Sequence, residues 1–186
     1  MPDPNDSDAP TAGALTLRKP QATDGPAVTA LIAACPPLDR NSAYCNLVQC
    51  THFADHCVVA EKDGELVGWV SGHRPPSNPD DFFVWQVAVS SAARGQKLAN
   101  RMINHLIERP EQAGVTHLIT TVTDDNAASW ALFNGLARDW NTGLERTALF
   151  EREAHFAGAH DTEYQARIGP LADNKNDKQP QEKQGQ

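Results

Sequence analysis

One apolar run constrains the fold more than any other feature of this sequence. Residues 82–89 read Phe-Phe-Val-Trp-Gln-Val-Ala-Val, and Gln86 is the one polar residue among them. An apolar run of this length without polar alternation is typical of a strand that is buried on both faces of a sheet. The run therefore predicts a central strand that helices cover on each side.

The segments around this strand predict an α/β (α+β) class. Apolar spacing and capping residues indicate helices over residues 23–35, 43–50, 98–107 and 126–136. Further strands are predicted over residues 15–18, 57–60, 66–70, 117–122, 146–150 and 164–168. This order of elements predicts one mixed sheet with helices on both faces.

The two ends of the chain differ from its middle in composition. Residues 1–13 and 172–186 contain almost no side chain that a core could use, so we expect two disordered tails around one domain over residues 14–171. The whole chain carries 24 acidic and 16 basic residues, a net charge of −8. This balance argues against nucleic acid as a partner and favours a cationic small ligand.

Targeting features and cysteines both indicate a cytoplasmic protein. The N-terminal residues lack a signal peptide's basic and apolar regions, and no apolar run approaches the roughly 18 residues of a membrane span. We therefore expect no membrane partner. The four cysteines form no C-x-x-C pair, which favours reduced thiols over the alternatives of a disulfide or a metal site.

A turn after the apolar strand carries the first candidate site. Backbone N–H groups at a helix start have no intrahelical partner and lie at the positive end of the helix dipole, so they can bind a diphosphate. Arg94, Lys97 and Arg101 add positive charge to this turn, and no acidic side chain accompanies them. The alternative is an ordinary strand–loop–helix connection with a solvated basic face.

Residues 87–99, Val-Ala-Val-Ser-Ser-Ala-Ala-Arg-Gly-Gln-Lys-Leu-Ala, resemble the acetyl-CoA-binding motif of the GCN5-related N-acetyltransferase superfamily. The turn of that motif reads Arg/Gln-x-x-Gly-x-Gly/Ala, and Lys97 stands where it has its central Gly. We expect Lys97 to adopt helical backbone angles and its ammonium to contact a phosphate.

A second signature of the superfamily, Asn-x-x-Ala-x-x-Leu-Tyr, is approximated by residues 126–133. Here Ser129 replaces the Ala, and Phe133 replaces the Tyr that often acts as general acid. The departing thiolate is therefore expected to leave unassisted or to take a proton from water. The two motifs together imply that acetyl-CoA contacts Val87, Val89, Arg94, Gly95, Gln96, Lys97, Leu98, Ala99, Asn126 and Ser129.

Four separated segments are similar to the L-2,4-diaminobutyrate N-acetyltransferases, which make N4-acetyl-diaminobutyrate in the synthesis of the compatible solute ectoine. The segments are residues 37–46, 72–76, 83–89 and 155–158. This resemblance covers most of residues 14–171 and implies the superfamily fold, a central mixed, mostly antiparallel sheet of six to seven strands flanked by about four helices. It also implies acetyl-CoA as co-substrate, a small diamine as substrate and a homodimer. No metal is expected, because the seven His residues show neither i,i+4 nor Cys-paired spacing.

Many members of the superfamily carry a Glu on this strand as the base, whereas Gln86 cannot titrate here, so the proton acceptor is expected elsewhere or through water. Asp39 is the first candidate for holding a substrate ammonium and assisting catalysis, and its alternative role is a helix cap before Asn41 and Ser42. Asn41 and Tyr44 are plausible polar companions in substrate binding. Tyr44 also fits the apolar stripe of its helix.

Two further candidates also have alternative roles. Trp85 is a candidate wall of the substrate site and also fits a core position. His155 can titrate near neutral pH and is a candidate substrate contact or proton relay, while a purely structural role is the alternative.

The leading hypothesis is an N-acetyltransferase in which a neutral diaminobutyrate amine attacks the thioester directly. One alternative is an acetyltransferase for another small amine. The other is an acyl-CoA-binding sensor without turnover. Two departures from the superfamily pattern support this alternative, namely Lys97 in the phosphate turn and Gln86 in place of a Glu on the apolar strand.

Overall fold

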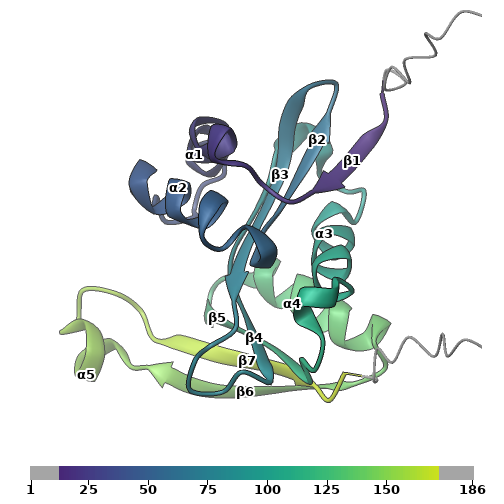
Figure 1. The fold of residues 1–186 in the computed structure, drawn as a ribbon. Helices are drawn as coiled ribbons and strands as arrows, with labels where there is room; N and C mark the ends of the chain where they lie inside the picture. The colour runs from purple at the N-terminus through teal and green to yellow at the C-terminus, as the bar shows by residue number, and fades with distance from the viewer. Residues whose placement is uncertain (1–12, 172–186) are drawn as a thin grey trace, which may run out of the picture.

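The computed structural model describes residues 13–171, which form one sheet of seven strands (Figure 1). The spatial order is β1-β2-β3-β4-β5-β7-β6, and every neighbouring pair is antiparallel except β4 and β5. The expected mixed, mostly antiparallel sheet is confirmed. The strands are β1 (Leu15–Arg18), β2 (Val58–Lys62), β3 (Glu65–His73), β4 (Asp81–Val89), β5 (His117–Thr123), β6 (Gly143–Phe150) and β7 (Glu163–Gly169).

Helices cover both faces of the sheet (Figure 1). On one face, residues of α1, α2 and the sheet form one apolar cluster, which includes the buried Val28 of α1 and Trp69 of β3. A larger cluster lies on the opposite face, where Met102 and Phe133 pack from α3 and α4 against Phe82. The helices are α1 (Gly25–Ala33), α2 (Ala43–Thr51), α3 (Leu98–Ile107), α4 (Ala127–Asp139) and the short α5 (Arg152–Phe156).

The predicted tails, residues 1–13 and 172–186, lie outside the described residues apart from Gly13. The backbone N–H of Gly13 donates to Asp63 Oδ1 at 2.7 Å. Among the helices of residues 13–171, none combines the length and the apolar character that a membrane crossing requires.

The apolar run forms β4 as predicted, but its burial on both faces is only partly correct. The register between β3 and β4 shifts so that Ser71 pairs with Gln86 and Gly72 pairs with Val84, which leaves Trp85 in a β-bulge. Trp85 is 49% exposed as a result. Gly72 permits this close approach, because a Cβ there would lie 2.5 Å from the backbone oxygen of Phe83.

Candidate active site

The parallel strands β4 and β5 separate halfway along their length. Their pairing runs from Asp81↔His117 to Phe83↔Ile119 and stops there. The Ser90 N–H donates to Val67 O of β3 at 2.9 Å, and backbone direction alternates along a strand. Val87 and Val89 therefore direct their backbone N–H and C=O groups away from β3, toward the gap beside β5. This free edge can pair with an extended chain such as pantetheine.

The turn before α3 has the geometry of an anion site. Gly95 has φ +78°, and Lys97, the N-cap of α3, has φ +53° and ψ +28°. The expectation of right-handed helical angles for Lys97 is therefore wrong, because this position is left-handed. That conformation explains why the superfamily pattern has Gly there. No acidic side chain lies in the first turn of α3, as the sequence indicated.

The remaining cofactor candidates offer different groups. Leu98 is 3% exposed and its side chain belongs to the core, so it can contribute only its backbone N–H. Gln96 is exposed, and Ala99 is partly buried in the first turn of α3. Asn126 caps α4, because its Oδ1 accepts the backbone N–H of Ser129 at 3.1 Å.

Arg94 lies in the same exposed turn, after Val89. Its Nε donates to Val89 O at 3.3 Å, which ties the turn to the end of β4. The strand edge that would hold the pantetheine and the turn that would hold the phosphates are therefore linked.

Asp39 and Asn41 are brought together on β4 by Gln86. Asn41 Nδ2 donates to Gln86 Oε1 at 2.9 Å, and Gln86 Nε2 donates to Asp39 O at 2.6 Å. The alternative role of Asp39 as a helix cap is wrong, because Ser42 caps α2 and its Oγ accepts the N–H of Cys45 at 3.1 Å. The Asp39 side chain is exposed.

Two aromatic candidates lie at the surface rather than in the core. Tyr44 is 77% exposed on α2, so its alternative place in a core stripe is wrong. Trp85 is likewise not a core residue, and its ring lies 6.3 Å from that of His73, edge to face. Burial lowers the pKa of His73, and the neighbouring His56 lowers it further. Both exposed rings can offer a π-face to a cation.

His155 occupies an exposed position in α5. Its Nδ1 accepts the backbone N–H of Glu151 at 2.9 Å, and its ring packs edge to face on Phe150 at 5.8 Å. Both contacts are local to α5 and the end of β6. Among the described residues, no hydrogen bond or ion pair joins His155 to Asp39.

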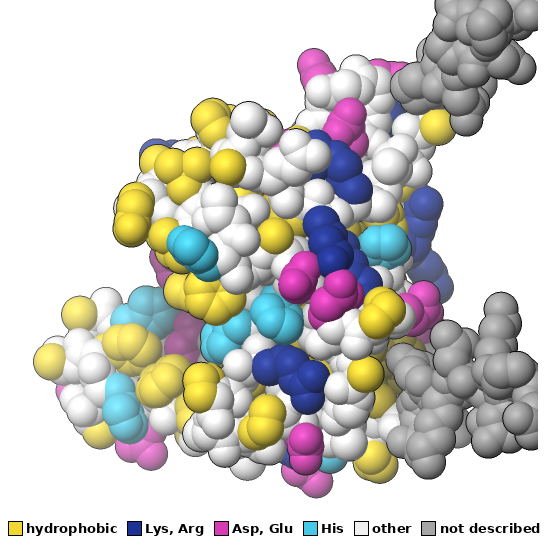
Figure 2. All heavy atoms as spheres, in the orientation of Figure 1, with side chains coloured by type: hydrophobic (Ala, Val, Ile, Leu, Met, Phe, Trp, Pro, Cys, Tyr) yellow, Lys and Arg dark blue, Asp and Glu magenta, His cyan; other side chains and the backbone are white. Residues whose placement is uncertain are grey.

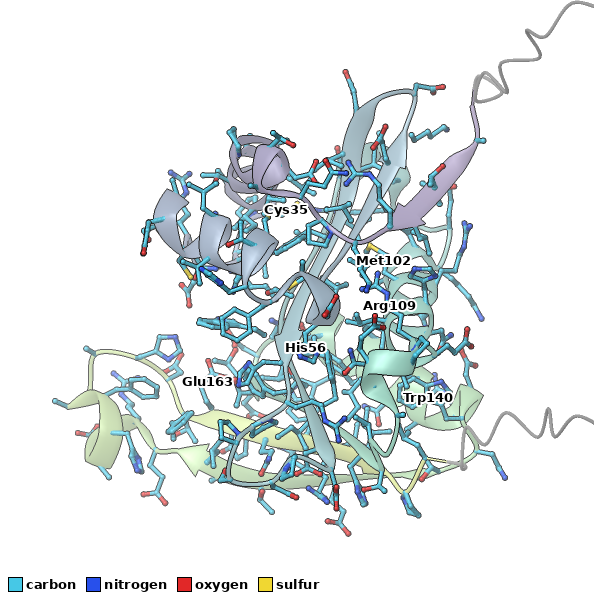
Figure 3. The ribbon with its side chains drawn as sticks, in the orientation of Figure 1. Cys35, His56, Met102, Arg109, Trp140 and Glu163 are labelled. Carbon is cyan, nitrogen blue, oxygen red and sulfur yellow. The ribbon has the colours of Figure 1, made fainter. Side chains whose placement is uncertain are left out.

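Sequence reasoning missed Glu163, the first residue of β7, and His160, which lies in the loop before it. The Nε2 atom of His160 lies 3.9 Å from Oε1 of Glu163. Burial raises the pKa of Glu163, against the opposing effects of His160 and of a hydrogen bond with Thr121. Figure 3 shows Glu163 on β7, near the level where the part of the molecule with α1 and α2 meets the part with β6, β7 and α5.

The charges of His160, Asp39 and Glu163 shift one another's pKa values. A hydrogen bond to the carbonyl of Asp161 raises the pKa of His160, and the charges of Glu163 and Asp39 raise it further. The charge of Asp39 also raises the pKa of Glu163. The sequence signal was a run of titratable residues, His160, Asp161 and Glu163, just before the last predicted strand.

The surface is hollowed beside His160. Figure 2 shows histidine side chains between the upper part of the molecule, which carries α1 and α2, and the lower part with β6, β7 and α5. An open cavity of about 380 Å³ adjoins His160. Its lining is polar and consists of Thr123, Asp125, Arg152, Ala159, His160 and Asp161.

A second open cavity, of about 420 Å³, lies between α1 and the β2–β3 hairpin and contains none of the candidate residues. Its one basic group, Arg18, is already paired with Asp24 at 2.7 Å and Glu61 at 2.8 Å. Among the described residues, no group of three His, Cys, Asp or Glu side chains is arranged to hold a metal ion. Of the two cavities, the polar one includes His160, the neighbour of Glu163.

The fold, the separated β4–β5 pair and the anion turn together define an acyl-CoA-dependent acetyltransferase. The chain belongs to the acetyltransferase (GNAT) family, whose model matches residues 26–136. The ribosomal-protein-S18-alanine N-acetyltransferase of Escherichia coli shares this fold, with a TM-score of 0.64 at 17% identity over 88% of this chain and 98% of that one.

Within this family, the chain belongs with the L-2,4-diaminobutyric acid acetyltransferases. It is 48% identical to the enzyme of Methylotuvimicrobium alcaliphilum, over 84% of this chain and 91% of the relative. It is 47% identical to that of Halomonas elongata, over 86% and 83%. The diaminobutyrate acetyltransferase of Paenibacillus lautus, solved in complex with L-2,4-diaminobutyric acid and coenzyme A, superposes with a TM-score of 0.81 at 38% identity, over 86% of this chain and 96% of that one.

Proposed function

We propose that the protein transfers the acetyl group of acetyl-CoA to the 4-amino group of L-2,4-diaminobutyric acid. The products are N4-acetyl-L-2,4-diaminobutyrate and CoA, a step of ectoine biosynthesis. The observation that carries the proposal is the similarity to the Paenibacillus lautus complex over 86% of the chain. Asp39 and Glu163 lie near enough for the charge of Asp39 to raise the pKa of Glu163, and two neighbouring carboxyl groups suit a substrate with two ammonium groups.

The reaction needs a neutral amine. A free γ-ammonium has a pKa of roughly 10.4, so its neutralisation at pH 7 costs about 4–5 kcal/mol. We assign Glu163 as the proton acceptor, because burial raises the pKa of its carboxyl and makes it a better base than an exposed carboxylate. Asp39, with Asn41, Tyr44 and Trp85 around it, holds the ammonium that does not react.

The acyl transfer then proceeds by direct attack. The amine nitrogen forms a bond to the thioester carbon, and the oxyanion of the tetrahedral intermediate is stabilised by backbone N–H groups at the Val87–Val89 edge. The C–S bond breaks and releases a thiolate, and the surplus proton of the attacking nitrogen passes through water to this thiolate, because a thiol has a pKa of about 8.5. Phe133 has no hydroxyl and is 3% exposed in the core, so it is not the proton donor.

His155 receives a smaller role in this proposal than the sequence suggested. Its Nδ1 is occupied by the Glu151 N–H, so we assign it to the structure of α5. We assign the functional imidazole to His160 instead of His155, because His160 lies next to Glu163 and its protonated form favours the carboxylate form of Glu163. His155→Ala should therefore affect the rate less than His160→Ala.

One assay tests the reaction and its base. Purified protein is mixed with acetyl-CoA and either L-2,4-diaminobutyric acid or other diamines, free thiol is followed, and the product is identified by NMR. Glu163→Gln should reduce kcat/KM by about a hundredfold or more and abolish the acidic limb of the pH profile, which the raised pKa of Glu163 sets. Glu108→Gln, at an exposed position after α3, is the matched control.

Other outcomes identify the alternatives. Thiol release with a different amine, and none with diaminobutyric acid, would show an acetyltransferase of other specificity. Acetyl-CoA binding without release would show an acyl-CoA-binding sensor. A Glu163→Gln variant with an unchanged pH profile would refute the assignment of the base alone.

We also propose a cytoplasmic homodimer. The edge strand β6 is exposed along nearly its whole length and ends in the exposed Leu149 and Phe150, which supports contact with a second copy. The four cysteines are free thiols, and burial raises the pKa of Cys50 to about 11 and that of Cys57 to about 12, consistent with a reducing compartment. Light scattering after size-exclusion chromatography tests the dimer, and a monomeric mass would refute it.

A further inference from the structure

Gln86 is a buried amide whose two ends both reach one segment of the chain. The residue is 7% exposed in β4 and pairs with Ser71 of β3, so its backbone is fixed within the sheet. Its Oε1 accepts Asn41 Nδ2 at 2.9 Å, and its Nε2 donates to Asp39 O at 2.6 Å. A carbonyl can only accept, so the contact with Asp39 O fixes the orientation of the amide.

The segment that Gln86 holds is anchored on its N-terminal side by Leu38, which packs on the core and donates its N–H to Cys35 O at 3.1 Å, while Asp39 and Asn41 themselves depend on Gln86. It connects α1, which ends at Ala33, to Ser42, the N-cap of α2, without helix or strand at Asp39 and Asn41. Among the described residues, Asp39 and Asn41 each make one hydrogen bond, and Gln86 is the partner in both. The place of the exposed Asp39 carboxylate therefore depends on an amide in the central strand.

We propose that Gln86 is a positioning residue, which holds the segment of Asp39 and Asn41 against β4 and thereby places the Asp39 carboxylate at the substrate ammonium. This inference rests on the proposed function. It assigns to Gln86 an effect on diamine binding and none on proton transfer, because an amide does not titrate and both of its ends are engaged.

An amide is the side chain that this place requires. It presents one acceptor to the Asn41 amide and one donor to the Asp39 carbonyl, and it carries no charge. A carboxylate would direct an oxygen at the Asp39 carbonyl and would add a negative charge beside the Asp39 side chain. An apolar side chain of the same length would leave two partly buried polar groups without partners.

The substitution Gln86→Glu gives a test that a merely structural role would not pass. Above the pKa of the new carboxyl group, the side chain cannot donate to Asp39 O. Below that pKa, its O–H can donate to Asp39 O while its C=O still accepts from Asn41, which restores both hydrogen bonds. The KM for diaminobutyric acid, as the ratio of variant to wild type, should therefore fall as the pH is lowered from 8.5 to about 6.

The ratio is used because other groups near the site titrate in both proteins. Their contribution to KM is shared by the wild type and the variant and cancels in the ratio. The charged and titratable groups on the neighbouring segments are Asp39 and Arg40 before α2, His73 in β3, His160 just before β7 and Glu163, the first residue of β7.

Three further variants separate positioning from general loss of packing. Gln86→Met removes both hydrogen bonds at similar volume and should raise the KM for diaminobutyric acid about tenfold or more at every pH, with the KM for acetyl-CoA unchanged. Asn41→Ala removes one of the two bonds and should have a smaller effect. Gln112→Met is the matched control, because Gln112 is 3% exposed and its amide makes hydrogen bonds with Asp55 O at 3.0 Å and with His56, and none with Asp39 or Asn41.

The outcomes distinguish this inference from the proposed function. If the wild type releases thiol with diaminobutyric acid and Gln86→Met leaves its KM unchanged, the role of Gln86 is refuted and the reaction stands. Loss of the acidic limb of the pH profile in Gln86→Met would also refute positioning. No thiol release by the wild type would refute the proposed function and this inference with it. If Gln86→Met does not fold, Asn41→Ala and the pH dependence of Gln86→Glu decide the matter.

Discussion

The left-handed backbone at Lys97 provides a sharp test of the phosphate turn. Lys97 has φ +53° and ψ +28°, and its side chain is exposed. An L-residue in this conformation carries a cost of about 1–2 kcal/mol that Gly does not carry. Substitution by Ala and by Gly removes the ammonium in both cases, so the difference between the two variants isolates the backbone.

The expected difference is small but measurable. Gly loses more conformational entropy on folding than Ala, by about 0.5–1 kcal/mol, which offsets part of the relieved strain. The free energy of unfolding of Lys97→Gly should therefore exceed that of Lys97→Ala by about 0.5–1 kcal/mol. In a domain of this size, such a difference corresponds to about 1–4 °C in Tm.

Thermal unfolding followed by circular dichroism measures this difference, and calorimetric titration with coenzyme A measures the loss of charge. Both variants should bind coenzyme A several-fold more weakly than the wild type and with a weaker dependence on salt, because one phosphate contact is lost. If Lys97→Ala is as stable as Lys97→Gly, the left-handed geometry is refuted. If both variants bind coenzyme A as tightly as the wild type, the ammonium does not contact the phosphates.

Two further predictions concern the core and the N-terminal ion pairs. Phe133→Tyr places a hydroxyl among apolar neighbours, so it should lower the free energy of unfolding by about 1–3 kcal/mol and change kcat less than about tenfold; a hundredfold change in rate would contradict the mechanism. Hydrogen bonds from Arg18 hold the pKa of Asp24 below its usual value, so the carboxylate stabilises the fold above that value and the contribution is lost as the pH falls through the lowered pKa. Asp24→Asn should therefore cost about 1 kcal/mol at pH 7 in thermal unfolding, and this cost should shrink as the pH falls below the ordinary value of 3.8 and through the lowered pKa, whereas a constant cost would contradict the sign.

Much of the fold could be predicted from local patterns. The apolar run of β4, the four-residue apolar repeat of α3 and the final strand all correspond to elements of the structure. These patterns suffice because burial on one stripe or one face repeats with the period of the element. The same patterns failed for Tyr44 and Trp85, since an aromatic residue at an apolar position has the same spacing whether the surface beside it is covered or open.

The candidate site was only half visible in the sequence. The turn around Lys97 is contiguous in the chain, so its residues could be identified together. The residues Asp39, His160 and Glu163 are not contiguous in the chain. Asp39 precedes α2, whereas His160 lies just before β7 and Glu163 is its first residue. No spacing rule connects residues more than a hundred positions apart.

The sequence by itself determined the strands, the four longer helices and the position of the turn before α3, because each depends on interactions between residues that are near one another along the chain. It did not indicate α5 or the left-handed backbone of Lys97. The tertiary structure alone decided that β4 and β5 separate after Phe83, that Gln86 holds Asp39 and Asn41, and that Glu163 is partly buried near His160 and Asp39. The physical reason is that the burial and partners of a side chain, and hence the pKa of a carboxyl group, depend on which segments the packed sheet brings together.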